Sequence, residues 1–245
     1  MKKKILVTGG TGYIGSHTSV ELIEAGYDVV IIDNLCNSEA EVVDRIEKIT
    51  GIRPLLEVFD LCNETRTELF FKNTAEIAAV IHFAAYKAVG ESVREPLEYY
   101  RNNLVSLLNL LSSMQKYGAV NMVFSSSCTV YGQPEKLPVT EEAPLQAAMS
   151  PYGNTNQICE EIIRDTTISS DKIKAISLRY FNPIGAHPSA LIGELPRGVP
   201  ENLVPYITQT AIGLREELNV FGNDYDTPDG SCIRDYLHVT DLAKA

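Results

Sequence analysis

A serine cluster and a tyrosine in this chain could take part in proton transfer. Ser125, Ser126 and Ser127 form the cluster, and Tyr152 stands 25 residues after Ser127, within the segment Ser150-Pro151-Tyr152. This segment begins a predicted helix, and a tyrosine held at a helix start near a serine is a candidate general acid and base. The alternative is that these serines cap helices or form turns, as most serine clusters do.

A glycine-rich turn near the N-terminus has the composition of an anion-binding site. Gly9, Gly12 and Gly15 follow an apolar run at residues 5–7 and precede a helical stretch. Free amide groups and the helix dipole at such a turn attract anions, and glycine lets a diphosphate approach the backbone. The spacing differs by one residue from the usual dinucleotide fingerprint, so a tight turn with close helix packing is the alternative.

Asp33 strengthens the dinucleotide interpretation. It ends the second apolar run, residues 29–32, about 20 residues past the glycines, where a ribose diol needs an acceptor. An acid at this place favours NAD over NADP. The alternative is that Asp33 merely opens a loop.

The elements that must position these residues alternate along the first two thirds of the chain. Apolar runs predict strands at residues 4–8, 28–33, 55–59, 79–83, 121–125 and 175–179, with helical stretches between them. The clearest helix follows Pro96 and ends at Gly118. This alternation predicts an α/β fold, a Rossmann-like doubly wound parallel sheet covered on both faces. Ligands of such sheets lie outside the carboxyl ends of the strands, where Ser125–Ser127 are expected.

The pattern changes after Asn182, where prolines and glycines interrupt the alternation and leave one good helix, at residues 203–214. We therefore expect residues 1–182 to form an NAD-binding Rossmann-like domain and residues 183–245 to form a smaller, partial substrate-binding region. Residues 240–245 have the pattern of a capped helix start that does not finish.

Length, charge and cysteine usage exclude several functional classes. The 245 residues can bury a large core, and 44% hydrophobic with 22% charged residues is typical of soluble globular proteins. A net charge of -11 makes nucleic acid and membrane surfaces poor partners, and no apolar stretch is long enough to span a bilayer. Five scattered cysteines favour reduced thiols in the cytoplasm. The four histidines are dispersed, with no pair at the spacing of metal ligands, so we expect no metal site.

Several motifs, in one order, resemble a known superfamily. The sequence is similar to the extended short-chain dehydrogenase/reductase superfamily at residues 8–15, 82–85, 125–127, 150–153 and 179–183. More narrowly, residues 87–92, 129–132, 185–188 and 234–239 resemble the UDP-glucose 4-epimerase family. The resemblance covers essentially the whole chain.

The resemblance implies an NAD-dependent interconversion of UDP-galactose and UDP-glucose. In that family, NAD accepts a hydride from C4 of the hexose while a tyrosinate removes the O4 proton, and the hydride then returns to the other face of the 4-keto-sugar. Tyr152 would be the base, and Ser127 would hydrogen-bond O4. The resemblance also implies a homodimer that pairs through the helices beginning after Pro96 and Pro151.

Further positions match the family's ligand contacts. Those for the cofactor are Gly9, Gly12, Tyr13, Ile14, Gly15, Asp33, Asn34, Asp60, Leu61, Phe83, Ala84, Lys87, Asn102, Tyr152 and Tyr180. Those for the UDP-sugar are Lys87, Ser127, Tyr152, Asn182, Asn202, Leu203, Phe221 and Arg234. Structural alternatives stay open for four of these residues. Phe83 and Leu203 could belong to the hydrophobic core, Asn102 could hydrogen-bond a buried backbone group, and Arg234 could pair with Asp235 on the surface.

One departure from the family lies beside the predicted base. The family pattern is Tyr-x-x-x-Lys, whereas Asn156 stands at the lysine position. A free phenol has a pKa near 10, so about one molecule in a thousand is ionised at pH 7. A cation about 5 Å away, at an effective dielectric constant near 20, favours the phenolate by roughly 3 kcal/mol. We therefore expect NAD binding with poor epimerisation.

A second departure is the ending, because family members continue past the position of Ala245 and supply a second arginine for the diphosphate. With Arg234 alone, we expect weak UDP-sugar binding. Two alternatives remain: a nucleotide-sugar dehydratase or decarboxylase, and a catalytically silent NAD-binding protein. Dehydratases place Asp-Glu after the strand-end Ser/Thr, whereas Cys128-Thr129 follow Ser127 here.

Overall fold

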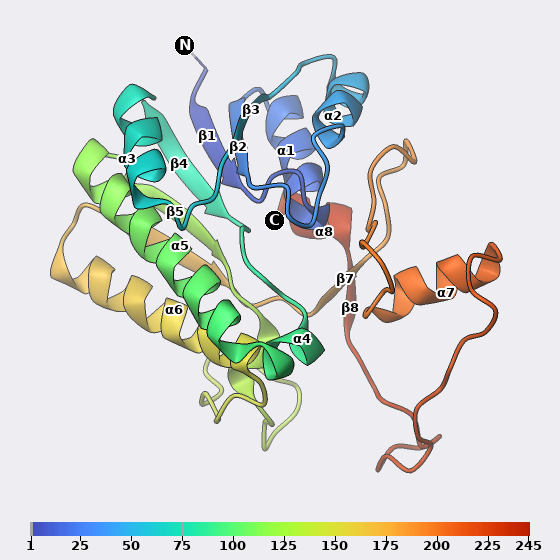
Figure 1. Cartoon of the computed structure of the whole chain (residues 1–245). Helices are drawn as coiled ribbons and strands as arrows, with labels where there is room; N and C mark the ends of the chain where they lie inside the picture. The colour runs from blue at the N-terminus through green and yellow to red at the C-terminus, as the bar shows by residue number, and fades with distance from the viewer. Residues whose placement is uncertain (1, 75) are drawn as a thin grey trace.

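In the residues that the computed structural model describes, 2–74 and 76–245, a six-stranded parallel sheet forms the centre of the protein (Figure 1). Its strands are β1 (Lys4–Thr8), β2 (Asp28–Asp33), β3 (Leu55–Val58), β4 (Ile77–His82), β5 (Asn121–Ser125) and β6 (Lys174–Leu178). The strand order is β3-β2-β1-β4-β5-β6, and all neighbouring strands are parallel. This confirms the predicted doubly wound α/β fold.

Helices cover both faces of the sheet (Figure 1). One face carries α1 (Tyr13–Glu24) and α2 (Val42–Thr50), and the other carries α3 (Glu64–Asn73), α5 (Pro96–Tyr117) and α6 (Pro151–Ser169). The short α4 (Val89–Arg94) precedes α5. Among the described residues, no helix is both long enough and apolar enough to cross a membrane.

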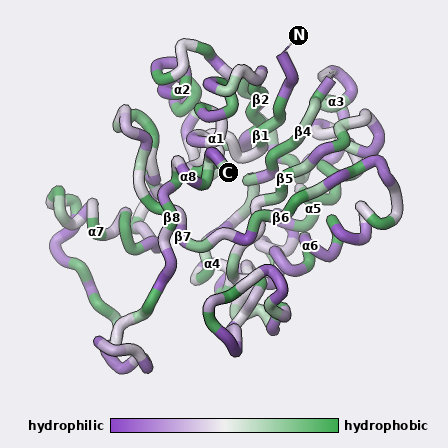
Figure 2. Tube along the Cα trace, turned by 180° about the vertical axis from the view of Figure 1, so that it is seen from behind, coloured by the Kyte–Doolittle hydropathy of each residue, from purple (hydrophilic) through white to green (hydrophobic). Residues whose placement is uncertain are grey.

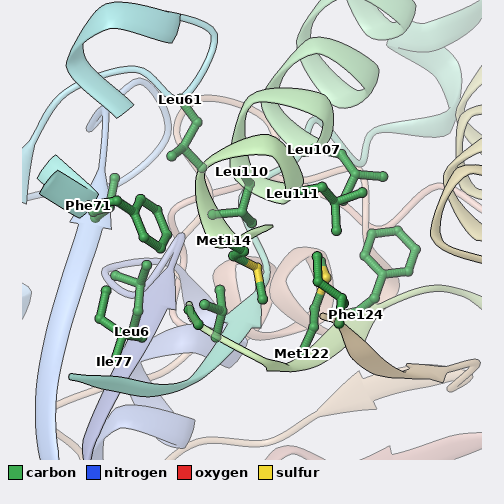
Figure 3. Packing of buried hydrophobic residues seen from close by; sticks show 14 of the residues in the cluster. Leu6, Leu61, Phe71, Ile77, Leu107, Leu110, Leu111, Met114, Met122 and Phe124 are labelled. Carbon is green, nitrogen blue, oxygen red and sulfur yellow. The ribbon is translucent and has the colours of Figure 1, made fainter. Parts of the chain in front are cut away.

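Alternate side chains of the strands belong to two separate hydrophobic clusters, one on each face of the sheet. In β1, Leu6 belongs to the same buried cluster as Leu107 and Met114 of α5 (Figure 3), whereas Val7 belongs to a second cluster with Val20 of α1 on the opposite face. Because both faces are buried, the strands are nearly continuous apolar runs, and Figure 2 shows the hydrophobic residues concentrated along them. The two clusters fix the positions of α1 and α5 on either side of the sheet.

The helix that carries Tyr152 has a well-defined start. The Ser150 hydroxyl accepts a hydrogen bond from the Gly153 amide at 3.1 Å, and Pro151 occupies the first helical position. Tyr152 therefore lies in the first turn of α6, as predicted. Ser150 is thus a cap, which is the ordinary use of serine.

Residues after β6 form a smaller part of the structure. Strands β7 (Asn182–Ile184) and β8 (Tyr236–His238) pair in parallel, and α8 (Val239–Lys244) packs against α1. Between them, α7 (Leu203–Ala211) and the irregular stretch after it lie to one side of the sheet (Figure 1). Ile192 belongs to the same buried cluster as Val7 and Val20, so this part is joined to the main core.

Several predicted boundaries are wrong by a few residues. Strand β4 begins at Ile77 because Ile77 pairs with Lys4 across a register irregularity. Helix α7 ends at Ala211, before Gly213 with φ of 76° turns the chain. Helix α8 begins one residue earlier than expected, because the His238 ring, and not a hydroxyl, caps it by accepting from the Thr240 amide at 3.3 Å.

Candidate active site

The glycine-rich turn combines close packing with an accessible backbone. A Cβ on Gly15 would overlap the carbonyl oxygen of Gly9, and a Cβ on Gly9, whose φ is 69°, would lie 2.8 Å from the Ala84 amide nitrogen. A Cβ on Gly12 would meet only the Gly9 oxygen, at 3.1 Å. Gly9 and Gly15 therefore let α1 pack on the sheet, while Gly12 leaves the helix start open to an anion. The close packing proposed for this turn is confirmed at Gly9 and Gly15, and anion binding at Gly12 stays a prediction.

Asp33 lies at the end of β2 and faces this turn. Its Oδ2 accepts from the Thr11 amide at 3.2 Å, and its Oδ1 accepts from the Leu35 amide at 2.9 Å and the Ser38 hydroxyl at 3.1 Å. The carboxylate thus shapes the following loop and is also fixed beside the glycines. Further lone pairs on its oxygens can accept ribose hydroxyls.

The neighbouring loops bring more of the predicted cofactor positions to the same edge of the sheet. Asn34 donates to Asp60 Oδ2 at 3.4 Å, and Asp60 Oδ1 accepts from the Cys62 amide at 2.8 Å. The Leu61 side chain is buried in the core (Figure 3), so only its backbone is placed to meet a ligand. Asn102 lies nearby on α5, where its carbonyl accepts from the Cys62 thiol.

Asn103, and not Asn102, hydrogen-bonds backbone groups through its side chain. The Asn103 side chain accepts from the Tyr86 amide at 2.9 Å and donates to the Tyr86 carbonyl at 3.1 Å. It also donates to the Thr155 hydroxyl at 3.1 Å, which joins α6 to the loop after β4. That loop carries Phe83, which packs partly buried on the core as its structural alternative proposed.

Ser127, Tyr152 and Asn156 meet beyond the carboxyl end of β5. Hydrogen bonding from the Ser127 and Asn156 side chains favours the phenolate of Tyr152, but burial raises the pKa of this phenol and is the larger effect. Asn156 is 6% exposed and also donates to the Tyr152 carbonyl at 3.1 Å. The Ser127 hydroxyl accepts from the Thr129 amide and so caps a short 3₁₀ turn, Cys128–Tyr131. In the part of the chain that the structure describes, no cationic side chain lowers the pKa of Tyr152, so the site favours the protonated phenol.

Tyr180 lies beside Tyr152. Its hydroxyl hydrogen-bonds the Ser125 hydroxyl, and its carbonyl accepts from the Cys128 amide at 3.1 Å. Burial raises the pKa of Tyr180, and the neighbouring Tyr152 raises it further. The two phenols and the serine segment therefore lie close together at the carboxyl end of β5.

A partly buried ion pair near these residues was not identified from the sequence. Glu160 accepts three hydrogen bonds from Arg179, at 2.6, 2.9 and 3.2 Å, and one from the Ser126 hydroxyl at 2.5 Å. The Arg179 guanidinium also lies 5.0 Å from the centre of the Tyr131 ring. Tyr152, Asn156 and Glu160 recur at four-residue intervals on one helix face, a signal that could have revealed Glu160.

Lys87 and Asn202, both predicted to hold the UDP-sugar, meet at a second carboxylate that the sequence analysis missed. Glu194 Oε1 accepts from Lys87 Nζ at 3.4 Å and from Asn202 Nδ2 at 2.5 Å. Its charge also raises the pKa of Tyr13, after the larger effect of burial. The Tyr13 hydroxyl donates to the Gly185 carbonyl at 2.7 Å, so the start of α1 contacts the C-terminal part. No sequence periodicity points to Glu194, because it lies in an irregular loop.

Asn182 and Arg234 lie near each other at the β7–β8 pair. Asn182 donates to the Asp235 carbonyl at 3.0 Å, and Arg234 donates to the Ile233 carbonyl at 2.7 Å. The Arg234 charge also lowers the pKa of Cys128, although burial raises that pKa more. Arg234 is therefore within electrostatic reach of the serine segment.

Leu203 and Phe221 are not brought into this cluster. Leu203 begins α7 with 52% of its surface exposed, so it is not the core residue that its structural alternative required. Phe221 is 85% exposed on the stretch after α7, apart from the sheet (Figure 1). Ile14 is half-buried at the start of α1, directly after the glycines. Within residues 2–74 and 76–245, no group of three acidic, histidine or cysteine side chains is arranged to hold a metal ion.

Comparisons with known proteins match nearly the whole chain. A model of the NAD dependent epimerase/dehydratase family matches residues 5–245. The UDP-glucose 4-epimerase of Dictyostelium discoideum is 54% identical over 98% of this chain and 70% of its own length. That of Homo sapiens is 52% identical over 100% of this chain and 72% of its own length. The crystal structure of UDP-glucose 4-epimerase from Bifidobacterium longum in complex with NAD+ and UDP has a TM-score of 0.96, at 48% identity, over 99% of this chain and 72% of that one.

Proposed function

The chain belongs to the NAD dependent epimerase/dehydratase family, among the UDP-glucose 4-epimerases, and on this premise we propose that it interconverts UDP-galactose and UDP-glucose with bound NAD. The observation that supports this most directly is the meeting of Ser127, Tyr152 and Asn156 beyond β5. In an open α/β sheet, this edge is where ligands bind.

The residues at the glycine-rich turn fit NAD. Gly12 leaves the start of α1 open to the diphosphate, and Asp33 is placed to accept the hydroxyls of a ribose. Asn34 and Asp60 extend this polar edge, and Asn102 lies on the adjoining face of α5. When bound, NAD would take up the hydride from C4 of the hexose and return it to the opposite face.

Tyr152 takes the O4 proton as the hydride leaves and returns it when the hydride comes back. The Ser127 hydroxyl orients O4 and, like the Asn156 amide, favours the phenolate through hydrogen bonding. Tyr180, which is buried beside Tyr152, helps to exclude water from the reacting atoms. The predicted positions Phe83 and Ala84 line the turn after β4, next to Gly9.

Residues 183–245 contribute to the UDP-sugar site, while residues 1–182 hold the cofactor. Lys87 and Arg234 supply positive charge for the diphosphate, and Asn182 and Asn202 supply amide groups. Asn202 stands at the start of α7, where the helix dipole favours an anion. Leu203 begins α7 directly after Asn202, and Leu203 and Phe221 stay proposed contacts of the UDP-sugar.

A second candidate function is NAD binding with little or no turnover. Asn156 supports it, because burial raises the pKa of Tyr152 and no lysine stands one helical turn away to offset this effect. Slow epimerisation and silent NAD binding therefore differ only in degree at this site. A dehydratase is the weaker alternative, because Cys128 and Thr129 follow Ser127 in place of an acid pair.

We also propose a cytoplasmic homodimer. Helices α4 and α5 expose apolar side chains, among them Val93 at 62%, Leu97 at 73% and Leu108 at 46%. A patch of this kind on one side of a molecule is typical of an interface. Cys36 and Cys232 are exposed free thiols, which suits a reducing compartment. Light scattering of the purified protein tests the dimer, and a monomer would contradict it.

The decisive experiment measures NAD content and turnover on the same preparation. NAD is quantified after denaturation, and conversion of UDP-galactose to UDP-glucose is followed with a coupled dehydrogenase. Bound NAD with slow but measurable conversion supports the proposal. Bound NAD without conversion supports the silent alternative, and a protein that neither retains nor takes up NAD contradicts both.

A further inference from the structure

Glu194 carries a negative charge at a place where the proposed function puts an anionic ligand. One of its oxygens, Oε1, accepts from both Lys87 Nζ and Asn202 Nδ2. These two side chains are the same ones that the UDP-sugar is proposed to use. Glu194 and a nucleotide diphosphate therefore compete for the same two donors.

The carboxylate is held firmly by its own loop. Ala186 and Gly193 form an antiparallel bridge, and the His187 amide donates to the Ile192 carbonyl at 3.1 Å. Ile192 is 4% exposed within the core cluster, which anchors the loop two residues before Glu194. The loop therefore cannot carry the carboxylate away without exposing Ile192.

The partners of Glu194 differ in their freedom to move. The Glu194 side chain is 12% exposed, whereas the Lys87 side chain is 51% exposed and has a long flexible stem. An arriving diphosphate would accordingly draw Lys87 toward itself, leaving Glu194 in place. The remaining negative charge would then repel the ligand at short range.

We propose that Glu194 is a positioning residue that holds Lys87 and Asn202 in the ligand-free protein and lowers the affinity of the site for nucleotide diphosphates. This inference rests on the proposed function, because it assumes that a UDP-sugar binds at these residues. Its consequence is that the diphosphate part of the ligand is bound weakly enough to be released, so that selectivity depends on the uridine and the sugar.

Glu194→Gln isolates the charge, because the glutamine side chain keeps an oxygen that can accept from Asn202. We expect UDP to bind roughly fivefold more tightly to this variant than to the parent, since an exposed ion pair contributes at most about 1 kcal/mol. Isothermal titration calorimetry at low salt measures this on the whole chain. The matched control is Glu201→Gln, which removes an equal charge from a surface pair with Arg94 at 3.7 Å and should leave UDP affinity unchanged.

Two comparisons separate a charge effect from a structural one. Uridine, which carries no phosphate, should bind the parent and Glu194→Gln equally. The gain in UDP affinity should shrink as salt rises. If Glu194→Gln does not fold by circular dichroism, Glu194→Asp withdraws the carboxylate by one methylene and should give a smaller gain of the same sign.

Equal or weaker UDP binding by the folded Glu194 variants would overturn the inference, as would an equal gain for uridine. A parent protein that binds no UDP at all, in calorimetry with the NAD-loaded chain, would instead overturn the proposed function on which the inference rests.

Discussion

Asn156→Lys tests the electrostatic argument about the Tyr152 phenol. Residues four apart on a helix have their Cβ atoms about 6 Å apart, so a lysine at this position in α6 reaches the phenol. At an effective dielectric constant near 20, a cation about 5 Å away favours the phenolate by roughly 3 kcal/mol, or about two pKa units. Burial of the new ammonium offsets part of this gain, because Asn156 is 6% exposed. We therefore expect the phenol pKa to fall by one to two units, on the order of 10- to 100-fold in phenolate at pH 7.

The assay compares turnover of UDP-galactose by the parent, Asn156→Lys and Asn156→Met across a range of pH. Methionine has nearly the length of lysine without its charge, so it controls for volume. Asn156→Lys should be roughly 10- to 100-fold faster at pH 7, and the difference should disappear above the phenol pKa of the parent, where all three are ionised. Equal rates for lysine and methionine at pH 7, or a gain that persists unchanged at high pH, would refute the reasoning.

Three further perturbations test the scaffold around this site. Gly15→Ala forces the new methyl group against the Gly9 carbonyl and should reduce retained NAD by about tenfold or more, measured after denaturation. Burial lowers the pKa of His82 to about 4, so protonation of this ring opposes folding. The free energy of unfolding is therefore unaffected by this ring above pH 6.5 and falls by about 3 kcal/mol as the pH falls toward 4. Urea unfolding at both pH values should show a smaller loss in His82→Gln. Glu160→Gln leaves Arg179 partly buried without its counter-charge and should cost about 2 kcal/mol in urea unfolding at pH 7.

Each of these three expectations has a contradicting outcome. Full NAD retention by Gly15→Ala would show that α1 can shift without loss of the cradle. An unchanged pH dependence in His82→Gln would assign the acid sensitivity to other groups. A Glu160→Gln protein as stable as the parent would mean that the pair with Arg179 contributes little, with Glu160→Asp as the control that keeps the charge.

Local sequence patterns were sufficient for the sheet and for the position of Tyr152 at a helix start. Apolar runs and glycine or proline boundaries specify β1, β2, β5 and α5, because both faces of the sheet must be buried. The position of Tyr152 followed in the same way from Ser150 and Pro151, which define a helix start.

Contacts between distant segments were beyond the reach of such patterns. The meeting of Glu194 with Lys87 joins residues 107 positions apart, and that of Asn103 with Thr155 joins residues 52 apart. Neither contact can be predicted from the local sequence pattern, because each depends on how whole helices, strands and loops pack together. The same reason explains why a backbone-satisfying role was assigned to Asn102 when the structure gives it to Asn103.

The pairing of β7 with β8 has a consequence for how this protein can diversify. Asn182 and Asp235, 53 positions apart, are hydrogen-bonded, so residues 185–235 leave and rejoin the scaffold at adjacent points. Changes in the length of such an insert cost little conformational entropy when its ends are fixed. The part of this segment beyond Ile192, which is anchored in the main core, can therefore change in length at little cost to the sheet.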